Sequence, residues 1–223
     1  MIAENSFGTP RNANEKNITN IVMMGMGEPL LNFDNVVSAM QLMRHHSAYN
    51  LSKRKVTLST SGLIPEINKL SKVSDVSLTI SLHAPNNKLR DTLVPINKKY
   101  PIQDLLKSVK DYVDSFNDKR VTTFEYILID KVNDSLNEAN ELANLLKDYP
   151  CKINLIPFNE FSLSGYSKPS NNRLRAFKEC LVKKGFITTI RSTRGDDIMA
   201  ACGQLVGEVK DKTKRKERLK RQV

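Results

Sequence analysis

The chain has 223 residues, of which 39% are hydrophobic, and this is enough for one domain with a single core. Its formal net charge of +11, from 35 lysines and arginines against 24 acidic residues, is typical of proteins that bind a nucleic acid. No run of about 18 apolar residues occurs, and no basic stretch followed by an apolar one opens the sequence, so neither a membrane span nor a secretion signal is expected.

The sequence contains three cysteines, at positions 151, 180 and 202. They are too few and too widely spaced for a disulfide framework or a CxxC metal site, so a reducing cytoplasm is the expected location. Cys151 lies at a predicted strand entrance and Cys180 in a predicted helix. Because a buried cysteine behaves as a small hydrophobic side chain, both are predicted to be structural.

After a polar, asparagine-rich opening, runs of β-forming residues alternate with stretches of helical periodicity. In chain order, the predicted strands cover residues 18–24, 55–60, 76–81, 121–129, 152–157 and 186–191. The predicted helices lie between them, over residues 33–44, 65–73, 102–116, from 135 onward and 171–184. This alternation predicts an α/β fold with six parallel strands, either as an open doubly wound sheet or as part of a barrel.

Local signals support three of these helices. The helix at 102–116 has the most regular apolar stripe. Ser135 followed by Glu138 predicts a capping box, and Gly185 suits a left-handed helix end. No repeat or linker interrupts the chain, so one domain is predicted, with a polar lead-in at 1–19, a core at 20–208 and a basic tail at 209–223.

The tail is strongly basic, because eight of the fourteen residues from Lys210 to Val223 are lysine or arginine. Such a tail can contact phosphates and make binding salt-dependent. A solvated, fraying terminal helix has the same composition. The tail alone leaves both interpretations open.

Polar residues that follow the predicted strands mark a candidate ligand site, since loops at the carboxyl ends of parallel strands build the sites of α/β folds. These residues are Gly27, Glu28, Ser59, Ser81, Leu82, His83, Asn159 and Cys202. A carboxylate, two hydroxyls, an imidazole and an amide at one edge can hold an amino acid and a ribose.

Structural interpretations of the same residues also stand. Spacing alone slightly favours a tight turn before a helix for residues 27–29, and serines at such positions are more often strand-end hydroxyls with local partners than ligand groups. His83 fits a packed, hydrogen-bonded histidine, whereas residues 45–46 look like solvated histidines at a helix end. Cys202 has small neighbours and nearby arginines, which favour an accessible thiolate, but an inert loop cysteine fits the composition slightly better.

Six strings occur in an order that resembles one known family. They are MGMGEPLLN (24–32), KVTLSTSG (55–62), ISLHAPN (80–86), LVPINKKY (93–100), CKINLIPFN (151–159) and TRGDDIMAACGQL (193–205). Together they are similar to the RlmN family of radical S-adenosylmethionine RNA methyltransferases. The resemblance covers about residues 20 to 216.

The resemblance implies a partial radical SAM (β/α) barrel that methylates C2 of adenosine in 23S rRNA and tRNA. It implies that S-adenosylmethionine contacts Gly27, Glu28, Ser59, residues 81–83 and Asn159. By the same resemblance, Cys202 first accepts a methyl group and then carries it to the RNA. A [4Fe-4S] cluster, an electron donor such as flavodoxin, a cytoplasmic location and a monomeric state are further implications of the family.

The sequence departs from the family pattern at its start. The family's CxxxCxxC cluster loop, first barrel strand, resolving cysteine, general base and N-terminal RNA-binding domain precede the region seen here, and three dispersed cysteines cannot ligate the cluster. The chain is therefore expected to be a fragment that is inactive alone. Two alternatives are a Cfr-like methyltransferase acting on adenosine C8 and a non-catalytic fragment that binds RNA or S-adenosylmethionine.

Overall fold

The computed structural model describes residues 18–25, 27–160 and 164–191. Its strands are β1 (Ile21–Met23), β2 (Val56–Thr60), β3 (Ser77–Ser81), β4 (Thr122–Leu128), β5 (Cys151–Pro157) and β6 (Ile187–Ile190). They form one sheet in chain order, and every pair of neighbouring strands is parallel. The predicted six-stranded parallel α/β architecture is confirmed, with each strand slightly shorter than its sequence pattern, except that β5 begins one residue earlier.

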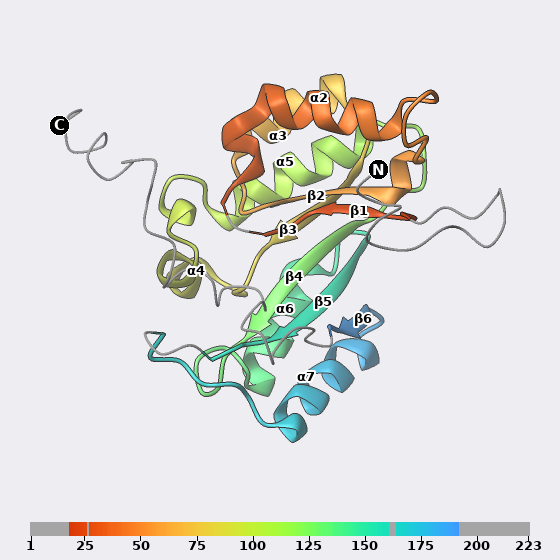
Figure 1. Ribbon diagram of the computed structural model, residues 1–223. Helices are drawn as coiled ribbons and strands as arrows, with labels where there is room; N and C mark the ends of the chain where they lie inside the picture. Colours follow the sequence, from red (N-terminus) through yellow and green to blue (C-terminus); the bar gives the residue numbers. More distant parts are fainter. Residues whose placement is uncertain (1–17, 26, 161–163, 192–223) are drawn as a thin grey trace, which may run out of the picture.

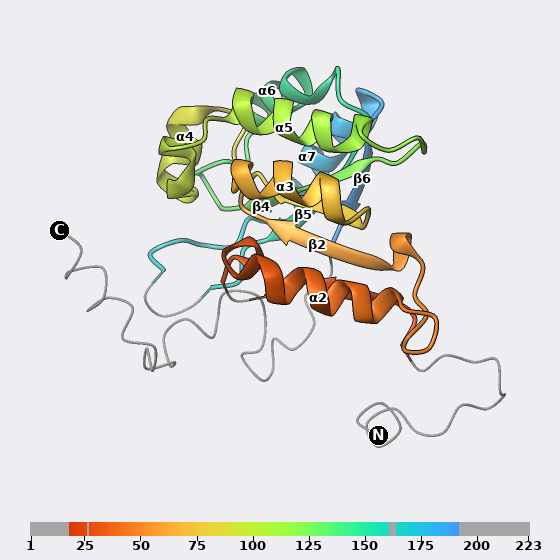
Figure 2. The same cartoon turned by 90° about the horizontal axis from the view of Figure 1, so that it is seen from above.

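The helices that connect the strands are α2 (Phe33–Arg44), α3 (Ile64–Val73), α4 (Asn87–Leu93), α5 (Ile102–Asp114), α6 (Leu136–Leu146) and α7 (Asn171–Lys183). Three short 3-10 helices accompany them: η1 (Pro29–Asn32), η2 (Lys53–Lys55) and η3 (Pro95–Lys98). Figure 1 shows α2, α3 and α5 along the first strands and α6 and α7 along the last ones. Seen from above in Figure 2, α2, α3 and α5 are separate helices over the first part of the sheet.

The core lies between the helices and one face of the sheet. Alternate strand residues such as Leu58, Ile80, Phe124 and Leu155 are at most 1% exposed and belong to one hydrophobic cluster with the helices. Removing side chains of this size from water supplies most of the favourable free energy of folding. Because successive strand residues point to opposite faces, the other face carries the residues between them.

The three local helix signals in the sequence are confirmed. The apolar stripe of α5 is buried from Ile102 to Tyr112, and Ser135 and Glu138 form the capping box of α6. Gly185 has a φ of +90°, as expected of the residue that ends α7. In α3, Ile67 and Leu70 are buried, whereas Val73, the last residue of the helix, is 49% exposed.

The α4–η3 segment was not predicted. Its residues, NKLRDTL and PINK, form no apolar stripe, and its buried members are Arg90 and Asn97. Asn86 caps α4 by accepting a hydrogen bond from the amide of Leu89 at 3.0 Å. The segment is held by buried polar contacts, which sequence periodicity does not report.

Within the described ranges, no helix combines the length and the apolar character needed to cross a bilayer.

Candidate functional site

The face of the sheet opposite the core is polar near its carboxyl edge. Ser59 is level with Thr79 on β3, while Ser81, Glu125, Asn154 and Thr189 form a row across β3 to β6. We call Ser59, Ser81, Glu125, Asn154 and Thr189 the polar face. On each of these strands, the residue two positions later points to the same face and lies at or beyond the carboxyl end of the strand. This is where α/β folds place their ligands.

Glu125 lies at the centre of the polar face and was not singled out by the sequence. Its Oε1 is 3.5 Å from Asn154 Nδ2 and 3.8 Å from the Arg191 guanidinium. The residue is only 4% exposed, and this burial raises the pKa of its carboxyl group against the opposing effect of Arg191. The hydroxyl of Ser59, on the same face, favours the charged form of this carboxylate.

Glu28 both shapes a turn and presents a carboxylate. Its Oε1 accepts the amide of Leu30 at 3.1 Å, and its Oε2 accepts both the amide and the hydroxyl of Ser61. Gly27, just before it, has a φ of +91°, where a side chain would be strained. The predicted tight turn is present, and three hydrogen bonds leave a carboxylate one of its roughly four acceptor directions for a ligand.

Ser81 is the last residue of β3, and Leu82 and His83 follow it and make different contacts. Leu82 is fully buried, its amide donates to the Glu125 carbonyl at 3.0 Å, and its carbonyl accepts from Arg90 Nε at 3.0 Å. Both of its main-chain polar groups are thus occupied by protein. A ligand that binds this stretch would therefore contact Ser81 and His83, whose side chains are half-buried.

His83 is fixed in one tautomer by its surroundings. Its φ is +62°, its Nδ1 accepts the amide of Ile127 at 3.2 Å, and its carbonyl accepts from Asn133 Nδ2 at 2.9 Å. A ring nitrogen that accepts carries no proton, so the proton is on Nε2. Burial, followed by the charge of Arg90, lowers the pKa of His83 to about 4. At neutral pH the ring is a neutral donor through Nε2.

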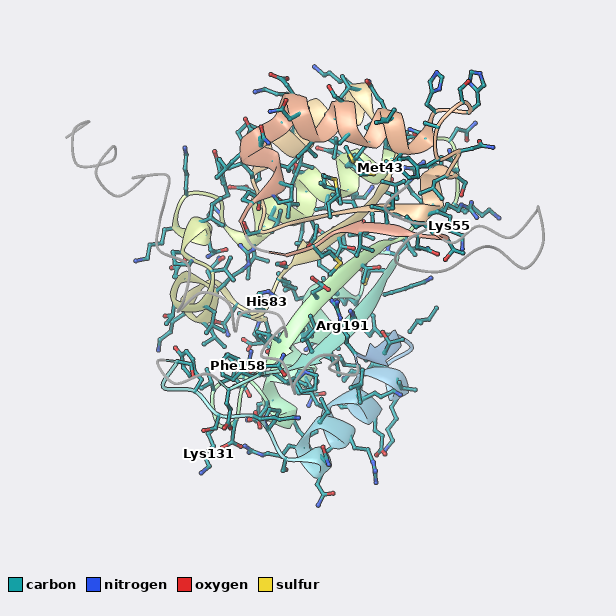
Figure 3. All side chains as sticks on the ribbon, viewed as in Figure 1. Met43, Lys55, His83, Lys131, Phe158 and Arg191 are labelled. Atoms are coloured by element: carbon teal, nitrogen blue, oxygen red, sulfur yellow. The ribbon has the colours of Figure 1, made fainter. Side chains whose placement is uncertain are left out.

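Asn159 is 9% exposed and follows Phe158, whose amide donates to the carbonyl of Leu128 at 2.9 Å. Figure 3 shows His83, Phe158 and Arg191 beside β4 and β5, away from Met43 and Lys55. The structure thus brings the predicted residues at the carboxyl ends of β1, β2, β3 and β5 to one edge of the sheet. Cys202 lies outside the described residues.

The other cysteines and histidines have structural or solvated surroundings, as predicted. Cys151 and Cys180 are half-buried and pack against the core, and burial raises the pKa of Cys151 to about 12. Cys180 Sγ lies 3.6 Å from Asn140 Oδ1. His45 and His46 are exposed at the end of α2. In the part of the chain that the structure describes, no group of three or more His, Cys, Asp or Glu residues could hold a metal ion.

An open parallel sheet with acceptors and donors converging at its carboxyl edge is the architecture of an α/β ligand-binding enzyme. The family model described as the radical SAM superfamily matches residues 10–146. A protein called dual-specificity RNA methyltransferase RlmN from Saccharophagus degradans is 61% identical over 217 residues, which are 97% of this chain and 54% of that protein. The protein of the same name from Pseudomonas entomophila is 58% identical over 217 residues, covering 97% and 57%.

A solved structure gives the same result. The crystal structure of a radical SAM methyltransferase from Sphaerobacter thermophilus superposes with a TM-score of 0.79 at 45% sequence identity, covering 83% of this chain and 54% of that one. The chain therefore belongs to the radical SAM superfamily and, within it, to the RlmN family. The sheet is accordingly a partial radical SAM barrel. The chain spans about half the length of the curated relatives that it matches.

Proposed function

We propose that this chain is the S-adenosylmethionine-binding part of an enzyme that methylates C2 of adenosine in 23S rRNA and tRNA. The observation that carries the proposal is the set of groups at the carboxyl edge: a carboxylate after β1, hydroxyls at the ends of β2 and β3, and a neutral imidazole after β3. Membership of the RlmN family and the net charge of +11 support RNA as the substrate.

The groups at this edge suit the parts of S-adenosylmethionine. When bound, this cofactor supplies both the methyl group and the adenosyl group of the family's radical chemistry. The free acceptor direction of Glu28 suits an ammonium group, because a charge-assisted hydrogen bond is strong at a half-buried position. The Nε2–H of His83 and the hydroxyl of Ser81 suit ribose oxygens, and the amide of Asn159 suits a base edge.

Ser59 and Leu82 have narrower roles in this proposal. The hydroxyl of Ser59 acts on the Glu125 carboxylate, so a cofactor contact there would be made beside that buried acid. Leu82 would act through its position in the core, which holds Ser81 and His83 on either side of it. Gly27 would let the loop main chain approach the cofactor closely, since nothing lies within 4 Å of a Cβ at this position.

Cys202 is proposed as the residue that accepts the methyl group and transfers it to RNA. The support comes from the sequence, in which small residues and Gly203 surround the cysteine and Arg191 and Arg194 precede it. Nearby positive charge favours the thiolate, which is the nucleophilic form. The proposed domain division, with a lead-in at 1–19, a core at 20–208 and a basic RNA-contacting tail at 209–223, rests on the same sequence argument.

The described residues do not fit an iron–sulfur cluster. Cys151 is at the amino end of β5 and Cys180 is on α7, and in the described ranges no third thiol accompanies them. No step is therefore assigned to such a cluster within this part of the chain. A cluster bound elsewhere in the enzyme, a flavodoxin-type electron donor, a monomeric state and a cytoplasmic location are proposals from the family resemblance.

A chimeric protein tests this function. The chain replaces the matching segment of one of the RlmN relatives, and the purified, reconstituted chimera is incubated with 23S rRNA or tRNA and S-adenosylmethionine. Mass spectrometry of the digested RNA is expected to show 2-methyladenosine. Detection of 8-methyladenosine would instead support a Cfr-like activity, and binding of both ligands without any methylated product would support a non-catalytic role.

A further inference from the structure

Arg90 is a fully buried arginine whose guanidinium binds only neutral oxygens in the described structure. Its Nε donates to the carbonyl of Leu82 at 3.0 Å, and its Nη2 donates to the carbonyls of Ser61 at 2.6 Å and Ser81 at 3.1 Å. Its Nη1 donates to Asn97 Oδ1 at 3.0 Å. Three of the four contacts thus go to main-chain carbonyls at the ends of β2 and β3.

These carbonyls belong to the stretches that carry the candidate site. Ser61 donates its amide and hydroxyl to Glu28 and its carbonyl accepts from Arg90, so it is held from both sides. Leu82 likewise donates to the Glu125 carbonyl and accepts from Arg90. One guanidinium therefore closes a chain of hydrogen bonds that runs from the loop after β1 to β4.

The rest of α4 and η3 holds the guanidinium in place. Asn97 is 1% exposed, and its Nδ2 donates to Asp91 Oδ1 at 2.6 Å and to Asn87 Oδ1 at 3.0 Å. Asn87 in turn accepts the amide of Ile102 at the start of α5. Only the fixed fork of a guanidinium offers this many donors in one plane.

Stability alone gives a poor account of this arrangement. Burying a charge without a direct salt bridge is costly, and the described structure gives Arg90 none. Burial lowers the pKa of Arg90 to about 10, and the charge of Asp91, which Asn97 links to the guanidinium, offsets this only in part. An apolar side chain of similar size would fill the same volume without that cost. What such a side chain could not do is hold three carbonyls from two strands at a fixed spacing.

We propose that Arg90 is a positioning residue, which fixes the ends of β2 and β3 so that Glu28, Ser81 and His83 keep the spacing that the cofactor requires. The inference deepens the proposed function, on which it rests for the identity of the cofactor. The positioning itself is a property of the chain without any ligand. It can therefore be measured separately.

The test uses Arg90→Lys, which keeps the charge, and Arg90→Met, which keeps the length. Arg120→Lys and Arg120→Met are the matched controls, because Arg120 also donates to a main-chain carbonyl, that of Asp75 at 2.9 Å, but before the amino end of β3. Amide hydrogen exchange is followed at Ser61, Leu82 and His83 in the 223-residue chain. The dissociation constant for S-adenosylmethionine is measured in the reconstituted chimera.

Both Arg90 variants are expected to speed exchange at these amides by roughly tenfold or more, since each loses contacts that hold the strand ends closed. Both are expected to weaken S-adenosylmethionine binding by about tenfold, the equivalent of one charged hydrogen bond. The Arg120 variants should stay within about twofold of the unaltered protein in both measurements. Wild-type behaviour of Arg90→Lys, or equal effects from the Arg120 variants, would overturn the positioning role.

Two further outcomes of these experiments are informative. If the unaltered chimera binds no S-adenosylmethionine, the proposed function fails, while hydrogen exchange still decides the role of Arg90. If the Arg90 variants do not fold, Asn97→Ser removes one guanidinium contact and leaves the arginine in place. It should raise exchange at Leu82 and the dissociation constant by about threefold, and unchanged values of both would refute the inference.

Discussion

Ser61 gives both of its donors to one oxygen of Glu28, 33 residues earlier in the chain, with distances of 2.8 Å from its amide and 2.7 Å from its hydroxyl. This bridge ties the loop after β1 to the end of β2. It also shows that Glu28 satisfies both interpretations of its motif, because the same carboxylate that shapes a turn is held at the carboxyl edge of the sheet. Because Glu28 both shapes the turn and presents a carboxylate, its replacement should affect folding and ligand binding separately.

Replacing Glu28 should therefore lower both stability and cofactor affinity. Glu28→Ala leaves the Ser61 amide without its partner, and a loss of about 1–3 kcal/mol in the free energy of unfolding is expected. Ser61→Ala removes only the hydroxyl contact and should cost about 1 kcal/mol. Urea denaturation of the two variants measures this difference.

The same pair of variants separates binding from folding. In the chimera, Glu28→Ala should weaken S-adenosylmethionine binding by more than RNA binding, because the ammonium partner is lost. Ser61→Ala should affect cofactor binding much less. Equal losses of cofactor and RNA affinity in Glu28→Ala would identify Glu28 as a turn residue only.

The stability of the fold should fall in mild acid because of His83. Its pKa is lowered to about 4 in the folded chain from the ordinary 6.5, so the unfolded chain binds a proton first as the pH falls. Above pH 6.5 the ring is neutral in both states, and holding it neutral costs no stability. As the pH falls from 6.5 to about 4, the free energy of unfolding should decrease by about 1–3 kcal/mol.

A variant isolates this contribution. His83→Asn keeps an acceptor near the Ile127 amide, and asparagine tolerates the positive φ, but it does not titrate. Its unfolding free energy should lose less between pH 7 and pH 4 than that of the unaltered chain. Identical pH profiles would show that His83 is not the group that titrates.

Asn133 should be among the most sensitive positions outside the site itself. It is fully buried, its Nδ2 donates to the carbonyls of His83 and Ile127, and its Oδ1 accepts the amide of Ile129 at 2.8 Å. Asn133→Leu has a similar volume but leaves these main-chain groups unpaired, so a loss of about 2–4 kcal/mol is expected. Asn144→Leu, at an exposed position of α6, serves as the control for the chemical change, and a comparable loss of stability there would contradict this interpretation.

Sequence periodicity was enough to predict the sheet and most helices, because an apolar stripe repeats every two residues in a strand and every three or four in a helix. It was also enough to place Glu28 and His83 at strand ends. It could not find Arg90, Ser61 or Glu125. Their roles come from contacts that no local repeat reports. Arg90 contacts Ser61, 29 positions earlier, besides residues 7 to 9 positions away, and Glu125 contacts Arg191.

One signal for these residues was present but local patterns could not interpret it. The string LVPINKKY was recognised only by resemblance, and its Asn97 proves to be the buried partner of Arg90. A polar residue that is buried because it binds a main-chain group elsewhere in the chain has the same local sequence pattern as a surface residue. The burial of Arg90 therefore had to come from the structure.

The proposed methyl transfer through Cys202 makes the sharpest chemical demand. Cys202→Ala in the chimera should abolish RNA methylation, whereas Cys151→Ala and Cys180→Ala should keep it, since those two thiols pack against the core. Each of these three cysteine-to-alanine substitutions should lower the free energy of unfolding by no more than about 0.5–3 kcal/mol. Methylated RNA is quantified from each variant at equal folded concentration.

Peptide mass spectrometry of the active, unaltered chimera tests the central claim most directly. The account predicts that, after turnover with S-adenosylmethionine, the peptide containing Cys202 carries the added mass of one methyl group in place of a hydrogen, while the peptides of Cys151 and Cys180 do not. An unmodified Cys202 peptide, together with undiminished RNA methylation by Cys202→Ala, would contradict the account.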